Sequence, residues 1–178
     1  MKLLIAIAAA AAALAGVAHA ESAPSDPWRV YASGGYTYAH ASISGTDINV
    51  GALTGRLGAR YGANLGVEAE GSFGVADDSI GGVNIKLNNQ YAVYAVGYLP
   101  VSPEWDLLAR IGYGRAKVSV SGGGVSGSSE GNTWNVGVGA QYNFGGHSAV
   151  RGEYTRLEST ESGGGHFDTA TLSYVYRF

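Results

Sequence analysis

The sequence contains no cysteine, only four prolines and no second long apolar run after its N-terminus. An exported chain without cysteine has no disulfide bonds and must be held together by other contacts. Without a second long apolar run, no further helix through a bilayer is predicted. The four histidines are scattered, so no metal site or other cofactor is expected. The formal net charge of −3, with no basic stripe, gives no support to nucleic-acid binding.

The N-terminus has the layout of a secretory signal peptide. Met1-Lys2 is followed by an apolar, alanine-rich run up to Val17 and then by Ala18-His19-Ala20. This order of a basic start, an apolar run and an Ala-x-Ala site predicts cleavage after Ala20. A retained membrane helix is the alternative, but the run is shorter than the ~20 residues a spanning helix needs. We expect a signal peptide over residues 1–20 and a polar periplasmic lead over 21–27.

The residues that are abundant favour strands. The chain has 29 glycines and 12 tyrosines; glycine disfavours helices and tyrosine favours sheets. The last ten residues alternate strictly. One face is apolar or aromatic and carries Ala170, Leu172, Tyr174, Tyr176 and Phe178. The other is mostly polar and carries Thr169, Thr171, Ser173, Val175 and Arg177. Such a segment is an amphipathic closing strand, which is typical of a transmembrane β-barrel.

Eight segments with this alternation follow one another along the chain. They span residues 28–38, 50–61, 65–74, 84–99, 105–114, 134–144, 150–155 and 169–178. Their connections alternate between long polar loops, including 76–82 and the Gly/Ser-rich 121–131, and short turns. This pattern predicts an all-β fold, an eight-stranded antiparallel up-and-down transmembrane β-barrel over residues 28–178. Short periplasmic turns, longer extracellular loops and two periplasmic termini follow, and the last strand must pair with the first.

The apolar face carries aromatic residues at two heights, as expected for rings that lie at two membrane interfaces. The set near the short turns comprises Trp28, Tyr61, Trp105, Tyr142, Phe144, Tyr176 and Phe178. The set near the long loops comprises Tyr36, Tyr38, Phe73, Tyr91, Tyr113, Trp134 and Tyr154. A soluble sandwich gives no reason for this stratification.

The polar face collects charges of both signs. In a narrow eight-stranded barrel this face fills the lumen with side chains. We predict a structural ion-pair network there, made by Arg56, Glu68, Glu70, Arg110, Arg151 and Glu153. A charged lumen argues against a lipocalin- or avidin-like barrel, whose lumen would hold an apolar ligand. No catalytic role is expected for these carboxylates.

Several short motifs, together with the signal peptide, resemble a known family. They are Gly35-Tyr36-Thr37-Tyr38, Gly66-Val67-Glu68-Ala69-Glu70-Gly71, Arg151-Gly152-Glu153-Tyr154 and Tyr174-Val175-Tyr176-Arg177-Phe178. In this order and spacing they look like small outer-membrane β-barrels of Gram-negative bacteria: OmpA-like transmembrane domains, OmpX-like proteins and opacity-type surface antigens. The resemblance implies that Tyr174, Tyr176 and Phe178 form a terminal signal read by the barrel-assembly machinery. It brings no catalytic residues with it.

Three cations fall on the outward face near the expected extracellular ends of their strands. Arg115, Lys117 and Arg156 could there contact lipopolysaccharide phosphates, for which arginine and lysine are favourable partners. Ordinary solvated rim charges are the alternative.

The leading functional prediction is a non-enzymatic, monomeric outer-membrane barrel among lipids and lipopolysaccharide. It would support the envelope or present surface loops for adhesion or host contact, through an extracellular ligand that the sequence does not identify. The first alternative is a small low-conductance porin, because the lumen is polar. The second is a lipid A-modifying enzyme, because His40 and Ser42 share the outward face at a spacing that resembles the His/Ser pair of barrel deacylases. No glutamate is assigned to orient His40.

Overall fold

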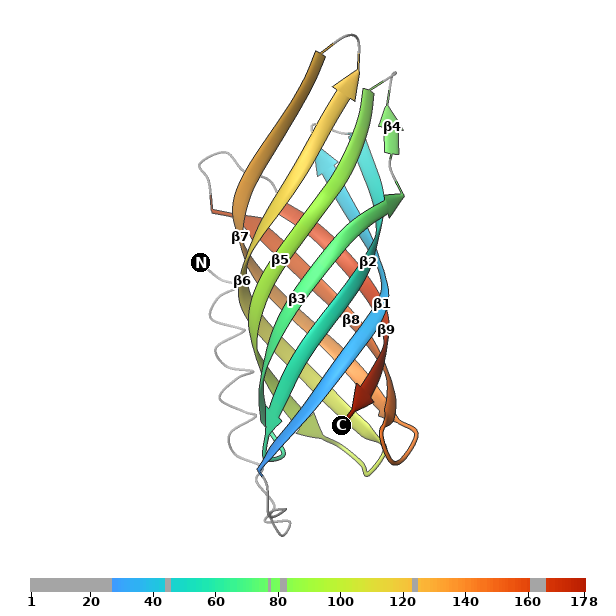
Figure 1. Cartoon of the computed structure of the whole chain (residues 1–178), viewed down its shortest axis with the longest axis vertical. Coiled ribbons are helices and arrows are strands. Elements are labelled where there is room, and N and C mark those ends of the chain that lie inside the picture. Colours follow the sequence, from blue (N-terminus) through green and yellow to red (C-terminus); the bar gives the residue numbers. More distant parts are fainter. Residues whose placement is uncertain (1–26, 44–45, 77, 81–82, 123–124, 161–165) are drawn as a thin grey trace.

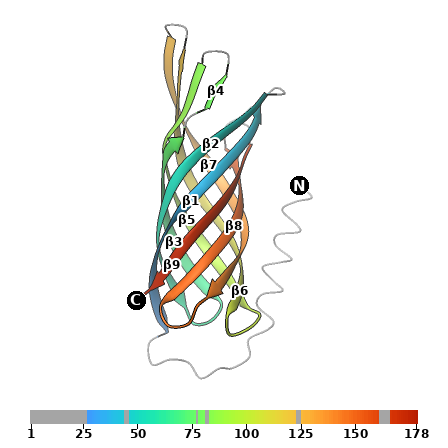
Figure 2. The ribbon, with the colours of Figure 1, turned by 90° about the vertical axis from the view of Figure 1, so that its right-hand side faces the viewer.

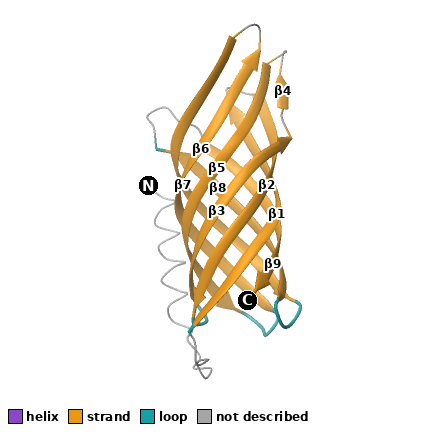
Figure 3. Ribbon diagram, viewed as in Figure 1, coloured by secondary structure: helices purple, strands orange, loops and turns teal. Residues whose placement is uncertain are grey.

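One antiparallel sheet, closed into a barrel, makes up the described part of the protein (Figure 1). The structure, a computed structural model, describes residues 27–43, 46–76, 78–80, 83–122, 125–160 and 166–178. Within these ranges the chain is strand apart from short connections (Figure 3). No helix among the described residues is long and apolar enough to cross a membrane. The expected signal peptide lies outside the described residues, as does the lead up to residue 26.

Eight long strands form the wall of the barrel, as predicted. They are β1 (Trp28–Ile43), β2 (Thr46–Tyr61), β3 (Leu65–Ala76), β5 (Val83–Pro100), β6 (Trp105–Gly122), β7 (Val125–Asn143), β8 (Ser148–Ser159) and β9 (His166–Arg177). A ninth, three-residue strand, β4 (Asp78–Ile80), pairs with β5 beyond the end of β3. The prediction of an eight-stranded antiparallel barrel is therefore confirmed.

The barrel closes where the first strand meets the last. β1 pairs with β2 on one side and with β9 on the other, in a register that runs from Tyr31↔Arg177 to His40↔Asp168. β3 pairs directly with β5, which completes the ring. Closure satisfies backbone groups that would cost several kcal/mol each if left unpaired in hydrocarbon. The predicted pairing of the last strand with the first is confirmed.

The two ends of the barrel differ, as Figure 2 shows. At one end, three short connections, 62–64, 101–104 and 144–147, join β2 to β3, β5 to β6 and β7 to β8. Gly62 and Gly145 turn the chain with positive φ angles of 60° and 85°, which glycine adopts without a Cβ penalty. We call this the short-turn end; β1 begins there and β9 ends there. The opposite end is called the hairpin end.

The described parts of two predicted loops at the hairpin end are strand, so these two predictions were wrong. The 76–82 segment contains β4, and in the 121–131 segment β6 and β7 remain paired as far as Gly122↔Val125. Glycine and serine have weak strand preferences, but a strand already held in register continues to form ladder hydrogen bonds with its neighbour. β5 also follows β6 up to Asn84↔Ser121. β5, β6 and β7 thus extend as a sheet beyond the rest of the barrel (Figure 1).

The burial pattern is the reverse of that in a water-soluble protein. Outward side chains are apolar and exposed: Leu57 is 65% exposed and Leu172 is 64% exposed. Inward side chains are polar and buried, and Arg151 is 1% exposed. Exposing this much apolar surface is unfavourable in water and favourable in lipid. The faces are those predicted from the alternation.

The aromatic residues on the outer face contact one another within the two predicted sets. At the short-turn end, Trp28 packs against Tyr61 with ring centroids 5.0 Å apart, and Trp105 packs against Tyr142 at 5.0 Å. Toward the hairpin end, Tyr113 packs against Trp134 at 5.4 Å. Small and aliphatic side chains lie between the sets. Two aromatic belts around an apolar band are typical of a membrane-spanning barrel.

Candidate functional site

The middle of the lumen is filled by the six charged residues predicted to pair there. They come from β2 (Arg56), β3 (Glu68, Glu70), β6 (Arg110) and β8 (Arg151, Glu153). Their side chains are at most 5% exposed. Three arginines and three glutamates make the cluster formally neutral, which matters because an unpaired charge in such a site is strongly destabilising.

Each glutamate of this cluster contacts more than one arginine. Arg56 Nε lies 2.7 Å from Glu70, and its Nη1 contacts Glu153. Arg110 Nη1 lies 2.9 Å from Glu70, 3.7 Å from Glu68 and 3.6 Å from Glu153. Arg151 Nη1 contacts Glu68 from the far wall. The pairs join β2, β3, β6 and β8 across the lumen, so the network ties opposite walls together.

Three tyrosines for which the sequence predicted no role complete this network. Tyr31 donates a hydrogen bond of 2.7 Å to Glu68, and its hydroxyl also lies 2.7 Å from that of Tyr98. Tyr94 donates to Glu70 at 3.2 Å, and the Arg110 guanidinium lies 4.1 Å from the centroid of the Tyr94 ring. The sequence signal that could have identified them is their place on the polar, inward face of their strands. A tyrosine on that face must find a partner for its hydroxyl inside the lumen.

Toward the hairpin end, hydroxyl side chains replace charges as lumen contacts. Thr37 of β1 lies 2.6 Å from Thr54 and 2.8 Å from Thr171, measured between hydroxyl oxygens. Thr54 in turn lies 2.8 Å from Ser72. This chain crosses β9, β1, β2 and β3, including the seam at which the barrel closes.

Two small cavities lie in the described part of the lumen, one on each side of the charged cluster. One lies beside Tyr31, Tyr98 and Gln141 and the other beside Gln90 and Tyr94; each has a volume of about 20 Å³. That is room for about one water molecule. The described side chains therefore form a plug rather than a channel.

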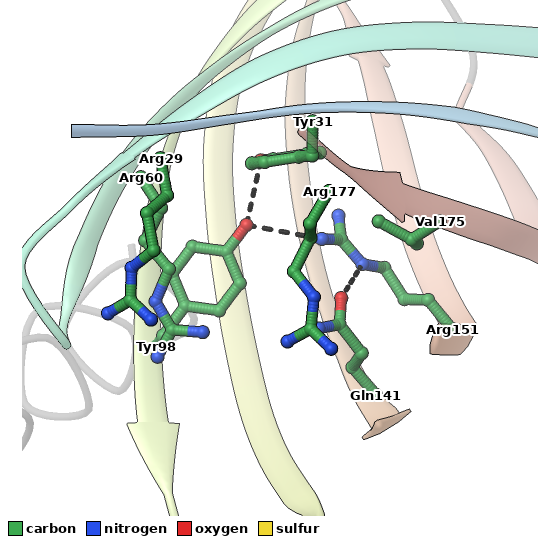
Figure 4. Close-up of a pocket in the computed structure, with 8 residues that line it drawn as sticks. All are labelled: Arg29, Tyr31, Arg60, Tyr98, Gln141, Arg151, Val175 and Arg177. Carbon is green, nitrogen blue, oxygen red and sulfur yellow. Dashed lines mark hydrogen bonds between the residues drawn. The ribbon is translucent and has the colours of Figure 1, made fainter. Parts of the chain in front are cut away.

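The mouth of the lumen at the short-turn end is rich in arginine (Figure 4). Arg29, Arg60 and Arg177 line the first of these cavities together with the deeper Arg151. Asp106 accepts hydrogen bonds of 3.1 Å from two nitrogens of Arg60. No role was predicted from the sequence for Arg29 or Asp106, although both lie on the inward face of their strands.

The three cations predicted to contact lipopolysaccharide lie on the outer face toward the hairpin end, each beside a carboxylate. Arg115 and Lys117 of β6 lie 2.8 and 3.4 Å from Glu130 of β7. Arg156 of β8 binds both oxygens of Asp168 of β9, at 2.8 and 2.9 Å. The Arg115 side chain is 67% exposed, so much of its surface remains accessible from outside.

His40, the centre of the enzyme alternative, lies on the outer face near the hairpin end. Its Nδ1 is 2.9 Å from Oδ1 of Asn49. Asp168 is its register partner on β9, but both oxygens of that carboxylate accept hydrogen bonds from Arg156. The side chain of Ser42 lies outside the described part of the structure.

The predicted assembly signal lies on the outer face at the short-turn end. Tyr174, Tyr176 and Phe178 alternate along β9 and its end, and Phe178 is 71% exposed. The rings of Tyr176 and Phe178 meet edge to face at 5.3 Å. This contact places Tyr176 and Phe178 in the aromatic belt at the short-turn end. Recognition of the three residues by the assembly machinery stays a prediction.

Solved structures of outer-membrane barrels have the same fold. Ail, the attachment invasion locus protein of Yersinia pestis, solved with the heparin analogue sucrose octasulfate, is 18% identical; the match covers 86% of this chain and 100% of Ail, with a TM-score of 0.66. Neisserial surface protein A is 13% identical over 83% of this chain and 95% of that protein, also at 0.66. The N-terminal barrel of OprF from Pseudomonas aeruginosa is 13% identical; the match covers 86% of this chain and 98% of that barrel, with a TM-score of 0.61.

A comparison with curated protein sequences found no match. The profile of the outer membrane protein beta-barrel domain matches residues 7–178, which include the whole barrel. The chain therefore belongs to the family of outer membrane protein beta-barrel domains, which function in the outer membrane of Gram-negative bacteria.

Proposed function

We propose that the protein is a non-enzymatic outer-membrane barrel with a closed lumen, which displays the extended β5–β6–β7 sheet at the cell surface for contact with other cells. In this orientation the short-turn end and both termini face the periplasm. Outer-membrane barrels have short periplasmic turns and longer extracellular connections, which supports this orientation. The fold shared with an attachment protein and a surface protein is consistent with the role.

The free edge of β7 is the observation that carries this proposal. Among the described residues, β8 pairs with β7 only between Thr133 and Asn143, and Thr160 donates to the Asn132 carbonyl, so residues 125–131 of β7 have a ladder partner on the β6 side alone. An exposed edge offers unpaired N–H and C=O groups to an extended segment of another protein. This stretch consists of Val125 followed by six Ser, Gly and Glu residues, and includes no proline. We expect the bound partner to add a strand to this edge.

Shortening the β6–β7 hairpin tests the proposal. Replacing residues 118–129 by Asn-Gly keeps the Lys117↔Glu130 pair beside a favoured two-residue turn. Cells that carry this variant in the outer membrane should adhere to epithelial monolayers at least about tenfold less than wild-type cells, a factor that corresponds to ~1.4 kcal/mol. The loss is expected because residues 125–129, most of the free edge, are removed while the barrel wall is kept.

The matched control replaces residues 41–48 by Asn-Gly and leaves the His40↔Asn49 pair beside the turn. It should adhere like the wild type, and both variants should fold, as judged by heat-modifiable migration on gels. Equal adhesion of the β6–β7 variant and the wild type would remove the proposed role of the edge.

The two alternative functions have less support. A pore would need an open path, whereas the lumen cavities hold about one water each; a steady open channel in a planar bilayer would contradict the closed lumen. A lipid A-modifying enzyme would need a group that orients His40 for catalysis. The group found at its Nδ1 is the Asn49 amide, and Asp168 is engaged by Arg156. A change in the lipid A mass spectrum on expression of the protein would favour the enzyme.

We also propose that Arg115, Lys117 and Arg156 contact lipopolysaccharide phosphates. All three face outward near the end assigned to the cell surface, and Arg115 has guanidinium nitrogens beyond the one that binds Glu130. Replacing all three by alanine should lower the lipopolysaccharide that co-purifies with the barrel about fivefold, since exposed charge pairs contribute ~0.2–1 kcal/mol each. Arg29→Ala, at the opposite end, is the control. Unchanged co-purification in the triple variant would assign these cations to the solvated rim.

A further inference from the structure

We infer that the arginine-rich mouth at the short-turn end is an anion-binding site. Arg29, Arg60 and Arg177 would there hold a carboxylate or phosphate group carried by a soluble periplasmic molecule. The periplasmic location of the ligand rests on the orientation proposed above, whereas the site itself depends only on the geometry of the mouth. Neither the lumen plug nor the proposed contact surface at the hairpin end uses these residues.

Three strands bring the arginines together (Figure 4). Arg29 lies at the start of β1, Arg60 near the end of β2 and Arg177 at the end of β9. All three line one cavity of about 20 Å³, whose deeper wall includes Tyr98 and Arg151. The Arg60 guanidinium lies 4.2 Å from the centroid of the Tyr98 ring, a contact that helps to hold it in place.

Among the described residues, one arginine donor at this mouth, Arg177 Nε, is buried without a hydrogen-bond partner. Arg177 donates to Asn143 Oδ1 at 3.0 Å and to the Ser148 carbonyl at 3.5 Å, but its Nε is buried and has no hydrogen-bond partner. Arg29 donates from one nitrogen to the Gly62 carbonyl at 3.1 Å. A guanidinium has five N–H donors in a fork that matches carboxylate and phosphate oxygens. A buried donor without a partner is costly, so an oxyanion that accepts from it would gain binding energy.

The charge balance at the mouth differs from that in the middle of the lumen. Asp106 is the carboxylate that contacts this group, and it accepts from Arg60 and from Asn143. Among the described residues, no salt bridge joins Arg29 or Arg177 to a carboxylate. Two of three positive charges thus remain without a paired acid. In the central cluster, by contrast, three glutamates balance three arginines.

The geometry also restricts the ligand. The cavity has room for about one water molecule, so one oxygen of an oxyanion fits inside it while the rest of the ligand stays outside the mouth. Arg29, Arg60 and Arg177 share the inward parity of Tyr31, Arg56 and Val175, whereas lipid phosphates lie outside the barrel wall. A soluble anion therefore fits better than a membrane lipid.

The test uses the barrel in phosphatidylcholine nanodiscs with 15N-labelled arginine, so that each Nε–H group is observed by NMR. Adding inorganic pyrophosphate should shift the Arg29 and Arg177 signals in a saturable way at about millimolar concentration. A triglutamate peptide should shift the same signals if carboxylates are also accepted. Arg177→Gln should weaken the response seen at Arg29 about tenfold, and Arg29→Gln should weaken that seen at Arg177 by a similar factor.

Sodium chloride at matched ionic strength is the control and should leave both signals unchanged. No saturable shift with either probe would overturn the proposal, as would an equal shift with sodium chloride, which would indicate ionic screening. Phosphatidylglycerol is also added to the nanodisc without a soluble anion. Shifts at Arg29 and Arg177 in that experiment would contradict the inference that the ligand is a soluble molecule rather than a membrane lipid. The variant with the shortened β6–β7 hairpin should retain the site, which separates this result from the adhesion assay.

Discussion

A barrel in which Arg151 is replaced by methionine is expected to unfold about 3–5 kcal/mol more easily than the wild type, the cost of removing one partner from a buried ion pair. Arg151 contacts Glu68 and donates to Gln141 at 2.9 Å, and it is 1% exposed. Its removal leaves Glu68 with a hydrogen bond from Tyr31 and a more distant arginine, Arg110, at 3.7 Å. Urea titration of the barrel in phospholipid vesicles, followed by tryptophan fluorescence, measures the change.

The paired variant Glu68→Gln/Arg151→Met separates charge from packing. Because both charges are removed, most of the lost stability should return, as reported generally when buried pairs are replaced together. If the single and double variants were equally destabilised, lost packing around Arg151 rather than the unpaired Glu68 would explain the effect.

Replacing Gly35 by valine is expected to prevent normal closure of the barrel. A Cβ on Gly35 would overlap the Leu172 carbonyl oxygen and would lie 2.6 Å from both Cα and Cβ of Ser173, on the partner strand of the seam. Backbone cannot yield as a flexible side chain does, so a destabilisation of ~3 kcal/mol or a failure to fold is expected. The measurement is the fraction of protein that shows the heat-modifiable, faster-migrating form after refolding into detergent.

Gly34→Val provides the control one residue away. Gly34 faces outward, and a Cβ there meets nothing within 4 Å. Valine also favours strands more than glycine does, so this variant should fold at least as well as the wild type. Equal folding of the two variants would show that the β1–β9 contact is looser than the structure indicates.

The wall of the barrel could be predicted because strand geometry is periodic. Alternation assigns every side chain to one face, which placed Arg56 and Glu70 inside together. Their pairing across β2 and β3 also follows from the short turn at 62–64, since a tight turn fixes the register of the strands it joins. The contacts of Arg56 with Glu153 and of Arg151 with Glu68 could be proposed only as members of one cluster, because partners across the lumen depend on how the sheet closes.

The parts that were missed depend on context that local sequence does not carry. The Gly/Ser-rich residues 121–122 and 125–131 have weak strand preference, and pairing with a neighbouring strand decides their conformation. The arginine mouth was missed because Arg29, Arg60 and Arg177 lie far apart along the chain and converge only when β1 meets β9. The alternation along each strand shows that all three face inward, but it does not show that they lie at the same height along the barrel axis.

The ion pairs across the lumen also have a consequence for the order of assembly. Arg151 and Glu68 are 83 residues apart in sequence, and Arg56 and Glu153 are 97 apart, so neither pair can form within a hairpin. Such non-local contacts slow folding, because chain entropy is lost before the contacts stabilise the product. A strand inserted one residue out of register would present leucines to the lumen and leave its charges in lipid. The central cluster therefore forms late in assembly, and only in barrels in which β2, β3, β6 and β8 have the correct register.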